Sequence, residues 1–315
     1  MNQINGYIEK NNPEPLDAES SNIPVFLHIP KCAGTYTLHI LIQLLYVYSY
    51  LKYKVIEPKK HGVVYQVYED DWLYLRVLAL DAKKDTRPGE ATELFKNLDY
   101  NGFLKLCHSG DLDIFCIVVT SQAFRVKNRD FLSIISSVEQ KSFIFFTNIR
   151  SVFSRCLSLY HVHKKNKRQM PSLYLPHDEF SAEEFSKFLT TADSSPNWIL
   201  QFFTHIFNMH TREVTEFVKK YMGIAHITEV VPQLIDVLNP MYGKGLTNFL
   251  TYLPQTHINA GNYAAVYTPT DLTVETLEKF KNAHSHDLAL VKAMLPELKY
   301  DETGVCENTL VKPSK

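Results

Sequence analysis

The sequence has no long hydrophobic run and no apolar leader. None of its segments approaches the roughly 20 consecutive apolar residues that a membrane-spanning helix requires. Residues 1–22 are polar, include Pro13 and Pro15, and lack the apolar core of a secretory signal. From these absences we expect a cytoplasmic protein with no membrane span, in which 1–22 form a flexible N-terminal arm.

Cysteines at metal-binding or redox spacing are also missing. The five cysteines are an odd number, and no C-x-x-C pattern occurs. Such cysteines are typical of a reducing compartment rather than of a disulfide framework. We therefore expect free thiols and no bound metal. The five are Cys32, Cys107, Cys116, Cys156 and Cys306.

The sequence carries almost no net charge. With 33 basic and 34 acidic residues, the formal charge is −1, which argues against a general nucleic-acid binder. The one basic run is Lys164-Lys165-Asn166-Lys167-Arg168. Charge runs of this kind are usually solvated surface, and binding of an acidic substrate is the alternative.

Apolar runs of strand length alternate with helical patterns. Residues 114–119 and 142–148 are predicted buried strands, and 182–189, 197–209 and 211–221 are predicted helices. The apolar positions Leu38, Leu41, Leu45 and Tyr48 recur at helical spacing after a strand near 25. The pattern predicts an α/β protein with a parallel central sheet flanked by helices. The aromatic stripe of 197–209 is interpreted as core; it consists of Trp198, Phe202, Phe203 and Phe207.

One segment departs from the alternation. Between 53 and 78 the chain is β-branched and aromatic, interrupted by polar breaks, which predicts a small antiparallel β meander. We interpret 52–110 as an insertion within a single domain over 23–300, followed by a C-terminal tail over 301–315. The meander either covers a sheet edge or forms a wall of a substrate site.

The most informative segment lies between 25 and 37. An apolar strand ends at Pro30, and Lys31, small residues, Gly34 and two threonines lead into a helix. Where a strand leads through a tight loop into a helix, the loop N–H groups and the positive end of the helix dipole lie close together, which favours binding of an anion. A buried strand and a helix cap with a merely solvated Lys31 is the simpler alternative.

The order of residues in this loop differs from the common nucleotide loop. That signature, G-x-x-x-x-G-K-S/T, has its lysine after the second glycine, whereas Lys31 precedes Gly34 by three positions. The segment His28-Ile29-Pro30-Lys31-Cys32-Ala33-Gly34-Thr35 instead resembles the H-I-P-K-T-A-G-T loop of carbohydrate sulfotransferases of the heparan-sulfate type. These enzymes use 3′-phosphoadenosine-5′-phosphosulfate (PAPS). Cys32 stands where the family has threonine.

A second motif follows at the expected place. After the strand at 142–148, Arg150, Arg155, Ser158 and Tyr160 fall at the spacings of the family's R-D-P-x-x-R-x-x-S-x-Y, although Ser151 and Val152 replace Asp-Pro. A guanidinium offers a planar fork that suits phosphate. The later segments 222–238, 257–259 and 273–295 resemble the family only in their apolar pattern.

The resemblance implies a P-loop-NTPase-like sulfotransferase fold and a PAPS-dependent sulfotransferase that moves the sulfuryl group to a hydroxyl and releases adenosine 3′,5′-bisphosphate (PAP). It implies that Arg150 and Ser158 hold the 3′-phosphate and that Lys31 also acts in catalysis by neutralising the leaving oxygen. No metal is required. The residues implied to hold the 5′-phosphosulfate are Lys31, Cys32, Ala33, Gly34, Thr35, Tyr36 and Thr37.

The general base is the point at which the resemblance weakens. Many relatives carry a histidine where this sequence has Gln122, and glutamine cannot accept the proton. We nominate His108 as the base, with His61 and His161 as alternatives. The expected acceptor is a hydroxyl of a carbohydrate or of a glycosylated or other small molecule. A degenerate homologue that binds PAP or a glycan without turnover is the second hypothesis, and a divergent nucleotide kinase the third.

Overall fold

The computed structural model describes most of the sheet and of the helices that flank it. The described residues are 2–11, 13, 16, 22–54, 62–69, 73–81, 112–121, 143–166, 182–207, 209–226, 230–253, 268–296 and 303–305. The segment 257–259 and, apart from 303–305, the tail over 301–315 lie outside these ranges. Among the described helices, none is long and apolar enough to cross a membrane.

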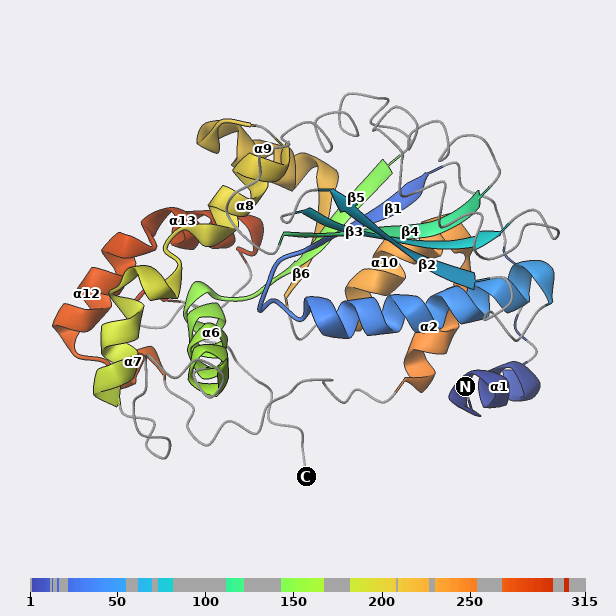
Figure 1. Cartoon of the computed structure of the whole chain (residues 1–315), viewed down its shortest axis with the longest axis horizontal. Coiled ribbons are helices and arrows are strands. Elements are labelled where there is room, and N and C mark those ends of the chain that lie inside the picture. Colours follow the sequence, from blue (N-terminus) through green and yellow to red (C-terminus); the bar gives the residue numbers. More distant parts are fainter. Residues whose placement is uncertain are drawn as a thin grey trace.

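A six-stranded mixed sheet in the order β2-β3-β4-β1-β5-β6 forms the centre of the protein (Figure 1). Four strands are parallel: β1 (Ile23–His28) lies between β4 (Leu112–Ser121) and β5 (Phe143–Ile149), and β6 (Met222–His226) pairs with β5. The predicted α/β class with a mostly parallel sheet is therefore confirmed.

The expected antiparallel insertion forms one edge of this sheet. Strands β2 (Gly62–Glu69) and β3 (Leu73–Asp81) pair antiparallel, and β3 pairs antiparallel with β4. The insertion thus extends the sheet beyond β4. The first strand expected in the meander, at 53–56, is not formed at its start because Tyr53 is the last residue of a helix.

Two hydrophobic cores pack on opposite faces of the sheet, because alternate residues of a strand point to opposite sides. Val25 and Leu27 of β1 contribute to one core, and Phe26 contributes to the other. The Phe26 face is covered by α2 (Gly34–Tyr53), α10 (Val230–Tyr242), α11 (Lys244–Thr247) and the 3₁₀ turn η7 (Asn248–Tyr252). Figure 1 shows α2 running along the sheet.

The Val25 face is covered by a second group of helices, at the left of Figure 1. Trp198, Phe202, Phe203 and Phe207 are all buried there, as expected of core residues. The 3₁₀ turns η5 (Ala192–Ser194) and η8 (Pro269–Asp271) lie in the connections of this group. Its helices are α6 (Val152–Asn166), α7 (Ala182–Leu189), α8 (Trp198–Phe207), α9 (Thr211–Tyr221), α12 (Val274–Ala283) and α13 (Ser285–Met294).

Helix α2 is fixed to the sheet at its C-terminal end. Its predicted apolar positions Leu38, Leu41, Leu45 and Tyr48 are buried. Asp113, near the start of β4, accepts hydrogen bonds from Tyr48 Oη (2.9 Å) and Tyr53 Oη (3.0 Å) and lies 3.1 Å from Lys52 Nζ. These contacts hold the C-terminal end of α2 on the start of β4.

The N-terminal segment differs from the flexible arm that its polarity predicts. Residues Asn2–Asn11 form helix α1, with Tyr7 and Ile8 buried. Tyr7 Oη donates to the carbonyl of Gly245 (3.0 Å), and the Tyr7 ring packs against Phe249. Two apolar side chains are enough to fix the helix because α11 and η7 provide a preformed surface.

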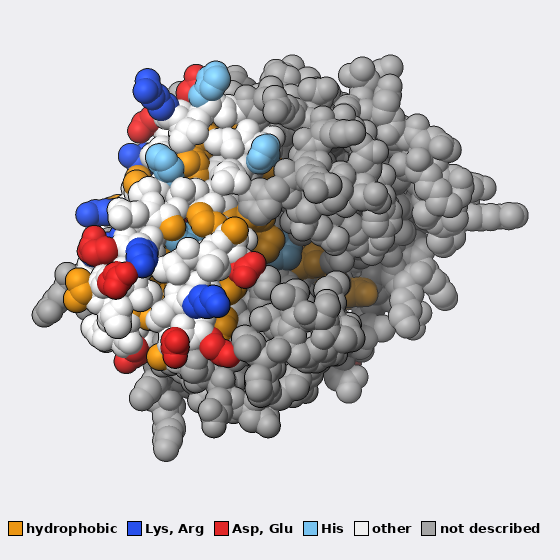
Figure 2. Space-filling view, turned by 60° about the vertical axis from the view of Figure 1, so that its left-hand side comes forward, with side chains coloured by type: hydrophobic (Ala, Val, Ile, Leu, Met, Phe, Trp, Pro, Cys, Tyr) orange, Lys and Arg blue, Asp and Glu red, His pale blue; other side chains and the backbone are white. Residues whose placement is uncertain are grey.

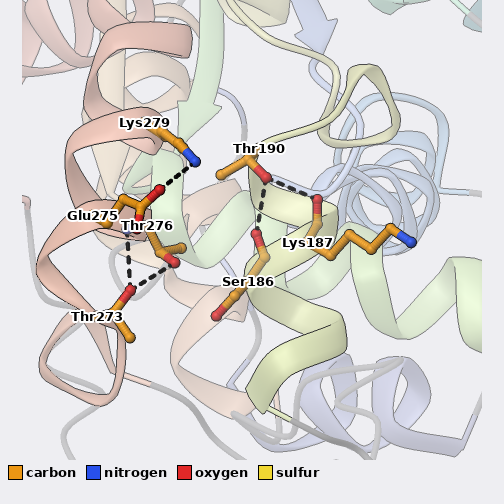
Figure 3. A network of polar contacts seen from close by, with 7 residues as sticks. All are labelled: Ser186, Lys187, Thr190, Thr273, Glu275, Thr276 and Lys279. Atoms are coloured by element: carbon orange, nitrogen blue, oxygen red, sulfur yellow. Dashed lines mark hydrogen bonds and ion pairs between the residues drawn. The ribbon is translucent and has the colours of Figure 1, made fainter.

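Side-chain hydrogen bonds cap the end of α7 and the start of α12 (Figure 3). Thr190 Oγ1 donates to the carbonyls of Ser186 (3.3 Å) and Lys187 (3.1 Å) at the end of α7. Thr273 Oγ1 accepts from the Thr276 N–H (3.2 Å) at the start of α12. Figure 2 shows acidic and basic side chains mixed over the described residues. Lys279 and Glu275 of α12 form one ion pair (2.6 Å; Figure 3).

The segment 273–295 forms two helices that meet at His284. The break lets α13 dock on the start of α8, where each helix caps the other. Asp287 accepts from the N–H groups of Ile199 (3.1 Å) and Leu200 (2.8 Å), and Asn197 Oδ1 accepts from the N–H of Asp287 (3.1 Å). Reciprocal capping of this kind satisfies donors that a helix start leaves unpaired.

His284 should make stability depend on pH. Burial, followed by the Arg155 charge, lowers the pKa of its fully buried imidazole from 6.5 to about 4. Between these values the unfolded chain binds a proton that the folded chain does not, so stability falls as the pH falls through this window. The difference corresponds to ~3 kcal/mol.

Urea unfolding of wild type and His284→Gln from about pH 7 to about pH 4 checks this linkage. The free energy of unfolding of the wild type is expected to fall by ~3 kcal/mol more than that of the variant over that range. Parallel curves for the two proteins would show that His284 does not titrate as its burial requires.

Candidate functional site

The two loops that the sequence singles out lie next to each other. Strands β1 and β5 pair in parallel, with Leu27 opposite Thr147, so their carboxyl ends share one edge of the sheet. After β1 the chain passes through α2 to β2 on one side of the sheet, and after β5 it passes through α6–α9 to β6 on the other side. The edge between β1 and β5 is therefore a topological switch point. Ligands of open α/β sheets bind in the crevice at such points.

The loop from Ile29 to Ala33 has an alternating backbone conformation. Cys32 N–H donates to the Ile29 carbonyl (3.2 Å), which closes a tight turn. Lys31 (φ 68°) and Ala33 (φ 61°) are left-handed, whereas Cys32 and Gly34 have negative φ. Alternation of this kind turns successive N–H groups toward one point and forms an anion-binding concavity.

This conformation is unfavourable for the residues that adopt it. A left-handed conformation costs a residue with a side chain about 1–2 kcal/mol, and such strain is found mainly where it serves a site. Neither Lys31 nor Ala33 is a glycine, the residue that would adopt it without cost. The strained loop is therefore the candidate functional site.

The start of α2 adds further donors at the same place. Ala33 is the N-cap residue, and its side chain accepts no hydrogen bond. The Thr37 N–H donates to the Ala33 carbonyl (3.0 Å). The first-turn N–H groups have no acceptor within a helix, and the dipole makes this end positive. The Thr35 side chain is exposed at this turn.

Two cationic side chains interact electrostatically at the site. Burial, and then the charge of Arg150, holds the pKa of Lys31 below its usual value. Burial raises the pKa of the Cys32 thiol, against the Arg150 and Arg155 charges and a hydrogen bond from the Arg150 backbone. Cys32 therefore lies against the residue that follows β5. An anion bound here would relieve the repulsion between Lys31 and Arg150.

The His28 ring leaves no room for a side chain at position 34, which explains the glycine there. A Cβ added to Gly34 would lie 1.7 Å from His28 Cδ2 and 2.1 Å from Nε2, so the imidazole occupies the space of a side chain. The His28 ring also stacks on Phe26, at 6.1 Å between centroids and 13° between planes. His28 thus packs β1 directly against the first residue of α2.

Hydrogen bonds beneath the loop connect it to β5. Thr37 is fully buried, its Oγ1 donates to the Ala33 carbonyl (3.3 Å), and Asn148 Nδ2 donates to the same Oγ1. Thr147 Oγ1 donates to the Leu27 carbonyl (2.6 Å). The Thr37 hydroxyl is engaged inside the protein, which differs from its expected role as a ligand contact.

Helix α6 begins directly after Arg150. Ser151, which replaces the family's aspartate, caps it by accepting from the Ser154 N–H (3.2 Å), a role that serine and aspartate both perform. Ser158 is half-buried in the second turn. Arg155 is only 3% exposed and lies over the Trp198 ring at 5.3 Å, so it belongs to the helical core rather than to the anion site.

The structure therefore brings most of the expected residues together. Lys31 to Tyr36 form the strained loop and the helix start, Arg150 lies beside them, and Ser158 follows on α6. His108, Gln122 and His61 lie outside the described residues, and the alternative His161 is buried on α6. Asn148 was not expected as a site residue; its polarity at the end of an apolar strand was the only signal.

Comparisons with protein-family models, with curated proteins and with solved structures each found no match. Among the residues that the structure describes, no group of three or more His, Cys, Asp or Glu side chains is placed to hold a metal ion. What the site does must therefore be argued from its own geometry.

Gly34→Ala is expected to destabilise the protein by about 2 kcal/mol, because overpacking against His28 forces the ring to move. Thermal unfolding measures the loss. Gly6→Ala is the matched control: Gly6 lies in α1 with no atom within 4 Å of an added Cβ, so this change should stabilise by ~0.5–1 kcal/mol.

The double variant His28→Ala/Gly34→Ala tests the cause. Removal of the ring leaves room for the new Cβ, so Gly34→Ala should cost less than ~1 kcal/mol in the His28→Ala background. Additive losses would mean that the collision with His28 is not what requires a glycine at 34.

Proposed function

We propose that the protein is a PAPS-dependent sulfotransferase with the fold of that family. The observation that carries the proposal is the strained, alternating loop with Lys31, placed beside Arg150 at the switch point of the sheet. A nucleotide with phosphates at both its 5′ and 3′ positions suits two adjacent cationic sites, one at a helix start and one at a strand end.

In this proposal the 5′-phosphosulfate lies on the N–H groups of Ala33 to Tyr36, and Lys31 contacts the oxygen that bridges phosphorus and sulfur. Arg150 and Ser158 bind the 3′-phosphate. The lowered pKa of Lys31 suits a group that stabilises, or protonates, an oxygen on which negative charge develops. The side chains of Cys32 and Thr37 support the loop from inside rather than contact the nucleotide.

The reaction is an in-line displacement at sulfur. The acceptor hydroxyl oxygen forms a bond to sulfur while the bond from sulfur to the bridging oxygen breaks, and PAP leaves with that electron pair. The hydroxyl proton passes to a general base, for which we nominate His108. Positioning and electrostatic stabilisation supply most of the acceleration in transfers of this type.

We further propose that the acceptor is a carbohydrate hydroxyl, or a hydroxyl of a glycosylated or other small molecule, and that the enzyme acts in the cytoplasm. The second candidate is a homologue that binds PAP without turnover, which Gln122 favours because an amide cannot accept the proton. Transfer of labelled sulfate from PAPS to a panel of hydroxyl acceptors separates these two.

Calorimetric titration with PAP tests the cofactor class. Wild type is expected to bind PAP, and ATP should bind far more weakly. Arg150→Ala and Lys31→Ala should each weaken PAP binding by about 10–100-fold, since each removes a charge-assisted contact with a phosphate.

Lys54→Ala is the matched control, because Lys54 is an exposed lysine in the same left-handed conformation at the other end of α2. Its PAP affinity should equal that of wild type. Absence of PAP binding by wild type, or equal affinity for ATP, would contradict the proposal.

A further inference from the structure

We propose that Asn148 is a positioning residue that fixes the distance between the two phosphate subsites; this inference rests on the proposed function. Asn148 lies on β5, two residues before Arg150, and its side chain bonds to the first turn of α2. Its side chain joins, through a hydrogen bond, the strand leading to Arg150 with the helix that begins at the strained loop.

The connection runs through a chain of directed hydrogen bonds. Asn148 Nδ2 donates to Thr37 Oγ1, and Thr37 Oγ1 donates to the carbonyl of Ala33 (3.3 Å). Ala33 is one of the two left-handed residues of the loop. A displacement of β5 relative to α2 would therefore act on the residue whose conformation aims the loop N–H groups.

Burial makes this connection rigid. Thr37 is 0% and Asn148 is 1% exposed, so water does not compete for either bond. The neighbouring Thr147 is held on both sides: its Oγ1 donates to the Leu27 carbonyl (2.6 Å), and its own carbonyl accepts from Gln233 Nε2 (2.9 Å). The end of β5 is thus fixed to β1, α2 and α10.

Asn148 is an unfavourable choice for packing alone. The strand around it is apolar, and Asn148 Oδ1 has no hydrogen-bond partner among the described residues. A buried amide that uses only part of its hydrogen-bonding capacity is less favourable than an apolar side chain of similar shape. What asparagine provides here, and an apolar residue would not, is the Nδ2 donor that holds Thr37.

The positioning role predicts a specific pattern of affinities. Each phosphate alone can adjust to its own subsite, whereas a nucleotide with both phosphates requires the subsites at one separation. Loss of the Asn148 bond should therefore reduce the affinity for adenosine 3′,5′-bisphosphate more than for adenosine 5′-phosphate or adenosine 3′-phosphate. A merely structural role would weaken all three ligands alike.

Calorimetric titration of the three nucleotides into wild type, Asn148→Leu and Thr37→Val tests this. In both variants the affinity for the bisphosphate should fall about tenfold or more, and the affinity for each monophosphate should fall less than about threefold. The double variant should bind the bisphosphate no more weakly than the weaker-binding single variant, because the two substitutions break the same chain of hydrogen bonds. Thr37→Ser keeps the hydroxyl and should retain wild-type affinity.

Several outcomes would overturn the inference. Equal losses for all three nucleotides, wild-type affinity in Asn148→Leu, or additive losses in the double variant would each do so while leaving the proposed function intact. A wild type that binds none of the nucleotides would remove both proposals. Should Asn148→Leu fail to fold, Thr37→Val breaks the same chain from the other side and decides the question alone.

Discussion

The parallel pairing of β1 with β5 is the interaction on which the rest of the site depends. It joins segments more than 100 residues apart in sequence and places two strand ends at one edge of the sheet. The strained loop and Arg150 become neighbours only because of this pairing. Backbone hydrogen bonds between buried strands are shielded from water, so the pairing holds the two loops in one relative position.

Around this pairing the site is supported mainly from within. His28 fills the space over Gly34, Thr37 and Asn148 hold the first turn of α2, and Ser151 caps α6. These contacts offset the unfavourable left-handed conformations of Lys31 and Ala33. The arrangement leaves Lys31, Thr35 and Arg150 as the partly or fully exposed side chains at the loop edge. Rigid support beneath a few accessible polar groups is what a preorganised anion site requires.

Much of this could be predicted because it is local in sequence. Strand patterns, the two junctions and the apolar face of α2 depend on spacing within about 20 residues. The bond between Asn148 and Thr37 spans 111 positions, and no local pattern indicates it. Helix α1 was missed for the same reason, since Tyr7 is buried by residues 238 and more positions away. The break at His284 reflects docking of α13 on α8.

The central claim is that the loop after β1 binds a phosphate group through its backbone. Backbone amide NMR during titration with adenosine 3′,5′-bisphosphate tests it most directly. The account predicts that the largest changes in chemical shift fall on the amides of Ala33 to Tyr36, with a second set at Arg150. Binding that shifts the signals of other amides and leaves those of 33–36 unchanged would contradict it.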